Sequence, residues 1–122
     1  MTDTNNKQER SENARMLHKQ GYNCCQAVVM AFADKLPIAP EHAQNMAAPF
    51  GRGLAGTREV CGCVSGMAMV CGLCGHTADV RPVIERFRED NGDIVCARLL
   101  TMGKRPCPDM VAYAAGLLAD TL

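Results

Sequence analysis

The sequence predicts an all-α protein, a compact single-domain bundle of five to seven helices around a central helix rich in glycine and cysteine. Two observations support this fold class. No segment alternates apolar and polar residues for long enough to form a convincing strand, and glycines, prolines and capping residues divide the chain into helix-length segments. With 122 residues, the chain has the usual size of one domain and can bury a core without disulfides. We therefore expect a flexible polar N-terminus at residues 1–10 and one helical domain at residues 11–122.

The N-terminal half is predicted to contain three helices, which span about 11–21, 24–35 and 40–48. Ser11 can cap the first helix, and Gly21 can end it, because glycine readily adopts the left-handed conformation that often closes a helix. Asn23 can cap the second helix, and Pro40 fits the first turn of the third. The following segment, 50–56, holds three glycines and is predicted to be a loop.

The central helix is predicted within the longest uncharged stretch of the chain, residues 60–75, with Thr57 as its cap. Half of these residues are glycine or cysteine, and the stretch is apolar on all sides, which is typical of a helix at the centre of a bundle. A membrane-spanning helix needs roughly 20 apolar residues, so this stretch is too short to be one.

Small residues gather on one face of this helix. At about 100° per residue, one face carries Cys61, Ser65, Ala68 and Gly72, so another helix can approach closely there. The Gly-x-x-x-Gly spacing of Gly62 and Gly66 also favours close helix packing. On the same wheel, Cys63 lies on a face far from that of Cys61.

The C-terminal half is predicted to contain three more helices, which span about 79–92, 93–102 and 108–118. Asp79 can cap the first and Gly92 can end it, while Asp93 can open the second. Pro108 suits the first position of the last helix.

Charge and composition exclude several classes of function. The 13 basic and 13 acidic residues balance, and no block of lysine and arginine occurs, so we expect neither nucleic acid nor a membrane surface as a partner. The first residues contain no apolar segment that could act as a signal peptide, so we expect a cytoplasmic protein whose thiols are reduced at rest. The many small and methionine residues would suit a helix-packed homodimer.

The eight cysteines exceed what folding requires. Cys71 and Cys74 have the C-x-x-C spacing of thioredoxin-type sites, but the βαβ context of those sites is missing. A zinc site needs a second pair, and the other cysteines have non-standard spacing for one. Cys63, Cys71 and Cys74 are therefore expected to be small buried apolar residues.

Two other cysteines have features of reactive thiols. Cys24 and Cys107 are each predicted at the start of a helix, where free N–H groups and the helix dipole favour a thiolate. Arg105 precedes Cys107, and Arg58 lies about one turn before Cys61, so positive charge can lower these thiol pKa values. Such thiols are nucleophiles or metal ligands, although a cysteine can also simply be tolerated at a helix start.

Three stretches together resemble a known family. They are residues 21–28, which include Cys24; residues 50–53 followed by 60–66, which include Cys61-Gly62-Cys63-Val64-Ser65-Gly66; and the isolated Cys96 and Cys107. This pattern is similar to that of the redox-active proteins named for the cysteine signature C, GCAxxG, C, C. The resemblance assigns the redox-active positions to Cys24, Cys61, Cys96 and Cys107. The chain has Cys63 where the motif usually has alanine.

The resemblance implies a redox protein with one clustered set of four thiols. A similar cysteine-bearing domain occurs in split-Soret cytochromes, which are associated with an iron–sulfur centre. It therefore implies that Cys24, Cys61, Cys96 and Cys107 bind a [2Fe-2S] or [4Fe-4S] cluster for electron transfer with a redox protein partner, with Gly62 and Gly66 leaving room for the cofactor.

Two alternatives remain open. The same four thiols could work without metal in a thiol–disulfide oxidoreductase, or the chain could be a structural helical domain that binds zinc. In the cluster and disulfide hypotheses alike, the four thiols should lie close together in the fold.

Overall fold

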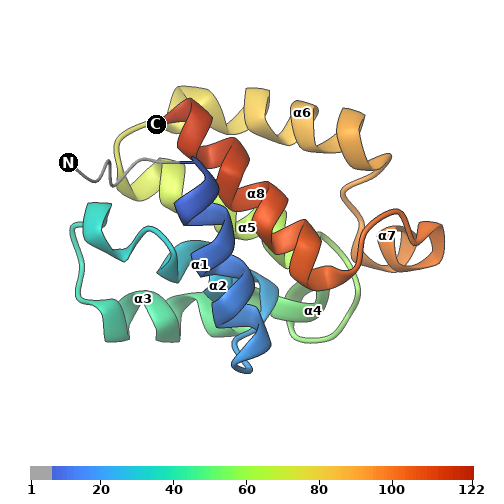
Figure 1. Cartoon of the computed structure of the whole chain (residues 1–122), viewed down its shortest axis with the longest axis horizontal. Helices are drawn as coiled ribbons and strands as arrows, with labels where there is room; N and C mark the ends of the chain where they lie inside the picture. The colour runs from blue at the N-terminus through green and yellow to red at the C-terminus, as the bar shows by residue number, and fades with distance from the viewer. Residues whose placement is uncertain (1–6) are drawn as a thin grey trace.

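The computed structural model describes residues 7–122, which form an all-α fold (Figure 1). It consists of seven helices and one short helical turn, α4, joined by three short 3-10 segments. The helices are α1 (Lys7–Lys19), α2 (Cys24–Met30), α3 (Pro40–Ala47), α5 (Gly62–Leu73), α6 (Val80–Asn91), α7 (Cys96–Met102) and α8 (Cys107–Thr121); the helical turn α4 is Gly51–Leu54, and the 3-10 segments are Ala33–Lys35, Ala48–Phe50 and Thr77–Asp79. Residues 7–122 contain no strand, which confirms the predicted fold class.

Helix α1 begins at Lys7, four residues before the predicted cap Ser11. Buried contacts of Arg10 account for this: its guanidinium donates a 2.8 Å hydrogen bond to the carbonyl of Ala31, pairs with Asp34 and lies over the ring of Phe32. The polar segment predicted to be flexible is therefore helical from residue 7, while residues 1–6 lie outside the described residues.

Other predicted helix ends agree in part with the structure. Asn23 caps α2 in a full capping box, and Gly92 ends α6 in the left-handed conformation, as predicted. Helix α2 stops at Met30, before the predicted end, and a turn and a 3-10 segment follow. Asp79 makes no capping hydrogen bond and instead binds His76, with 2.9 Å between carboxylate oxygen and ring nitrogen.

The central helix α5 packs against α2, α4, α6 and α8, and most of its residues are buried. Helices α1 and α8 lie side by side, with α5 behind α8 in the view of Figure 1. The largest fully buried side chains include Phe32, Phe87 and Met67. None of the helices within residues 7–122 has the length and apolar character required to cross a bilayer.

The close helix contact on α5 uses Gly62 and Gly66, as their spacing predicts. A Cβ on Gly66 would lie 3.0 Å from Cβ of Val28 on α2, and one on Gly62 would lie 3.0 Å from the nitrogen of Cys25. The predicted small-residue face is not the contact face, because Gly72 is exposed and nothing lies within 4 Å of where its Cβ would be.

Candidate functional site

Four cysteines lie at the starts of four different helices. Cys24, Cys96 and Cys107 are the first residues of α2, α7 and α8, and Cys61 is the N-cap of α5. All four line one cavity of about 390 Å³. The structure therefore brings together the four thiols that the sequence singled out.

A single antiparallel bridge between Val60 and Val95 places Cys61 beside Cys96. The N–H of Cys61 donates to the carbonyl of Ile94 at 2.8 Å, and the N–H of Cys96 donates to the carbonyl of Glu59 at 2.6 Å. Asp93 shapes the turn before this bridge, because its carboxylate accepts hydrogen bonds from two backbone N–H groups, those of the next two residues. Asp93 therefore does not open α7, which begins three residues later, at Cys96.

The capping box of α2 fixes the position of Cys24. The Asn23 side chain accepts a 2.9 Å hydrogen bond from the N–H of Gln26, and its amide donates to the carbonyl of Ala48, also at 2.9 Å. A Cβ on Gly51 would lie 2.2 Å from Cγ of Asn23, so only glycine fits beside this cap. Across the helix contact, a Cβ on Gly62 would lie 3.1 Å from that of Cys24.

Cys63 is a fifth thiol of the cavity, so the prediction that it lies on a packing face remote from Cys61 is wrong. It is fully buried, as expected, but it lines the cavity, and interactions with the thiols of Cys24 and then Cys61 raise its pKa. The helical wheel fails here because Cys61 has non-helical backbone angles (φ −54°, ψ 134°) and the helix begins only at Gly62. The predicted cap Thr57 lies outside α5, and its hydroxyl donates to the carbonyl of Gly53 at 2.7 Å.

The pKa values of the cavity thiols are shifted in opposite directions. Hydrogen bonds from Cys107 and Cys63 lower the pKa of Cys24, and a hydrogen bond from Cys63 lowers that of Cys61. The pKa values of Cys63 and Cys107 are raised, chiefly because their protons are shared with Cys24. In the metal-free protein, Cys24 is therefore the thiol that ionises most readily among those with shifted values.

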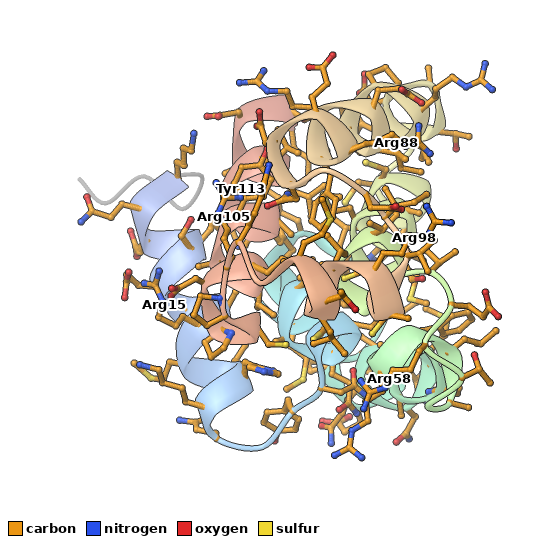
Figure 2. The ribbon with its side chains drawn as sticks, turned by 90° about the vertical axis from the view of Figure 1, so that its right-hand side faces the viewer. Arg15, Arg58, Arg88, Arg98, Arg105 and Tyr113 are labelled. Atoms are coloured by element: carbon orange, nitrogen blue, oxygen red, sulfur yellow. The ribbon has the colours of Figure 1, made fainter. Side chains whose placement is uncertain are left out.

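Three arginines line the cavity. They are Arg52, Arg58 and Arg105, and no Asp or Glu is among the described residues that line it. Nη1 of Arg58 donates to Sγ of Cys96 at 3.7 Å, so the arginine expected to act on Cys61 acts on Cys96. Figure 2 shows Arg58 beside the loop that precedes α5, and Arg105 next to Tyr113.

The other cysteines lie in the core or against it and do not line the cavity. Burial raises the pKa of Cys25 to about 12 and that of Cys71 to about 11, so both stay protonated at neutral pH. Cys74 is half-buried, and its thiol donates to the carbonyl of Lys35 at 3.6 Å. Cys71 is buried as expected, whereas Cys74 is only partly buried. Of the two glycines expected to leave room for a cofactor, Gly62 lines the cavity, whereas Gly66 lies only at the α2–α5 contact.

Thiols are the donor groups through which the cavity could hold a cofactor. Within residues 7–122, no three His, Cys, Asp or Glu side chains are arranged to hold one metal ion. An iron–sulfur cluster needs no such group, because its cysteine ligands are distributed over several irons.

Comparison with known proteins identifies the family. The family model described as "Putative redox-active protein (C_GCAxxG_C_C)" matches residues 22–121, a span that includes every cysteine of the cavity. No curated protein and no solved structure matches the chain. The chain therefore belongs to the family of redox-active proteins that is named for its C, GCAxxG, C, C cysteine signature.

Proposed function

We propose that the chain is an electron-transfer protein in which Cys24, Cys61, Cys96 and Cys107 hold an iron–sulfur cluster. The observation that carries this proposal is the convergence of four helix starts, each bearing a cysteine, on one cavity. Thiol–disulfide exchange needs two thiols, whereas four cysteines are the usual ligand set of [2Fe-2S] and [4Fe-4S] clusters.

The charges around the cavity suit an anionic centre. Four thiolates repel one another, and the N-terminal ends of helices together with arginines are the protein groups that stabilise negative charge. Arg52, Arg58 and Arg105 line the cavity, and none of its described lining residues is a carboxylate. When bound, a cluster would supply a one-electron redox couple. A hydrogen bond to a ligating sulfur, such as the one from Arg58 to Cys96, would raise the reduction potential of the cluster.

Anaerobic reconstitution with iron and sulfide tests the proposal. We expect the wild-type protein to acquire visible absorption with matching contents of iron and sulfide, and Cys61→Ala to lose most of both. Cys71→Ala is the matched control, because Cys71 is a buried thiol of α5, the helix that follows Cys61, and does not line the cavity. Wild-type protein that stays colourless and iron-free after reconstitution would refute the proposal.

Thiol–disulfide exchange is the second candidate, supported by the contact between the side chains of Cys24 and Cys107. The Cys24 thiolate would attack a disulfide RSSR and release one RS⁻, which takes up a proton. The Cys107 thiol would then lose its proton, attack the mixed disulfide and release the second RSH, which leaves a Cys24–Cys107 disulfide. Mass mapping of metal-free protein after mild oxidation tests this reaction, and oxidised protein without a bridge at Cys24 would exclude it.

A further inference from the structure

Arginines without a carboxylate partner are concentrated at the cavity. Most arginines of the described chain form ion pairs, namely Arg10, Arg15, Arg86, Arg88 and Arg98. Arg52, Arg58, Arg81 and Arg105 form no ion pair within residues 7–122, and all of them except Arg81 line the cavity. Three of the four arginines that form no ion pair among the described residues are therefore located around the thiols.

Arg52 and Arg58 are held at the cavity by unusual backbone geometry. Both have left-handed angles (φ 54° and 62°), which are unfavourable for residues other than glycine. Their backbones are adjacent, because the N–H of Arg58 donates to the carbonyl of Arg52 at 3.2 Å. Two neighbouring cations in a strained loop, both largely exposed, leave positive charge available to a group outside the chain.

Two exposed leucines lie near these arginines in the fold. Leu100 lines the cavity and is 51% exposed, and Leu54, at the end of α4, is 45% exposed. We call Arg52, Leu54, Arg58, Leu100 and Arg105 the mouth surface. In Figure 2, α7 lies between Arg58 and Arg105, so the positive charges lie on both sides of the helix that carries Leu100.

We propose that the mouth surface docks the acidic face of a partner electron-transfer protein. The proposal rests on the proposed function, since it places the partner directly over the thiol site. Complementary charge accelerates encounter and orients the two proteins, and a small apolar patch suffices for the weak, transient complexes of electron transfer. A protein fits better than a small anion, because both leucines and two of the arginines are exposed to solvent, where a large partner can contact them from outside the cavity.

Binding of a strongly acidic protein, a plant-type ferredoxin, tests the proposal, with basic cytochrome c as the counter-probe. We expect NMR titration to shift amide signals of residues 51–58 and 99–105 with ferredoxin, and Kd to rise at least about tenfold in Arg52→Glu and again in high salt. Arg81→Glu is the matched control, because Arg81 is unpaired within the described residues and does not line the cavity; its Kd should stay within about twofold of wild type. Arg52→Gln, which only removes the charge, should have an intermediate Kd.

Several results would overturn the proposal: no ferredoxin binding at low salt, equal Kd values for Arg52→Glu and Arg81→Glu, or tighter binding of cytochrome c than of ferredoxin. Melting temperatures of the variants show whether Arg52→Glu has damaged the fold. If it has, the Kd of Arg52→Gln decides whether the charge of Arg52 contributes to docking. Binding is measured with metal-free and iron-treated protein alike. If the protein binds ferredoxin but never binds iron, the docking proposal is supported and the cluster proposal is refuted. If it acquires the absorption of a cluster but does not bind ferredoxin, only the docking proposal is refuted.

Discussion

Replacing Gly66 and Gly72 of α5 by alanine, one at a time, should change stability in opposite directions. Both substitutions add one methyl group, and because both glycines lie within α5, both bring the same gain in helix propensity. Their surroundings differ: the new Cβ at position 66 would lie 3.0 Å from Cβ of Val28 and 3.2 Å from the carbonyl oxygen of Cys25, whereas nothing lies within 4 Å at position 72.

The expected magnitudes follow from these distances. Alanine is better than glycine in a helix by up to about 1 kcal/mol, so Gly72→Ala should raise the free energy of unfolding by about 0.5–1 kcal/mol. At position 66 the same gain is opposed by overpacking, which costs about 1–3 kcal/mol when neighbours must move. Gly66→Ala should therefore be about 1 kcal/mol less stable than wild type, and the difference between the two variants should be about 2 kcal/mol.

Urea denaturation of the reduced, metal-free protein, followed by circular dichroism, measures both values. The slope of unfolding free energy against urea should match that of wild type, which shows that only stability has changed. If Gly66→Ala is as stable as Gly72→Ala, the close contact between α2 and α5 is not a constraint on the fold. The assignment of Gly66 to helix packing would then be wrong.

Three further predictions concern a cap, a thiol and an ion pair. Asn23→Ala removes both the cap of α2 and a side-chain hydrogen bond to a backbone carbonyl, so unfolding in urea should show a loss of about 2 kcal/mol; a loss below about 0.5 kcal/mol would contradict the capping role. In metal-free protein near pH 6, iodoacetamide should alkylate Cys24 before Cys71, as mass mapping can show, because hydrogen bonds from Cys107 and then Cys63 lower the pKa of Cys24 whereas burial raises that of Cys71 to about 11. The hydrogen-bonded pair with Arg10 lowers the pKa of Asp34 below its ordinary value of 3.8, so this carboxylate adds stability above that pH and the contribution disappears as the pH falls through the lower folded value. Asp34→Asn should therefore be less stable than wild type at pH 6, and the difference should shrink below about pH 4; a difference that is the same at pH 6 and pH 2 would exclude the ion pair as its cause.

Local signals sufficed to predict most of the helices and part of the site. Two helix ends depend only on residues that are close in the sequence. They are the cap formed by Asn23 with Gln26 and the end of α6 at Gly92, and the structure confirms both. The positions of Cys24 and Cys107 at helix starts likewise follow from their neighbours in the sequence. Cys96 has no such local feature, and only the resemblance to the family identifies it.

The remainder depends on contacts between distant segments. A helical wheel counted from Cys61 placed Cys63 on the wrong face, since the helix begins only after Cys61 and not at the predicted cap Thr57. The pairing of Arg58 with Cys96 depends on the Val60–Val95 bridge, which is too short to leave a strand pattern in the sequence. The early start of α1 likewise depends on where Arg10 is buried.

The origin of the four thiols in four helices has a consequence for biosynthesis. Cys107 belongs to α8, the last described helix, and α8 packs against α1, the first. During translation the site is therefore incomplete until α8 has left the ribosome, and the early cysteines spend that time without their final neighbours. Any group that needs all four thiols can enter only after synthesis of this region. Its binding would then hold both ends of the domain together, because unfolding would have to release it.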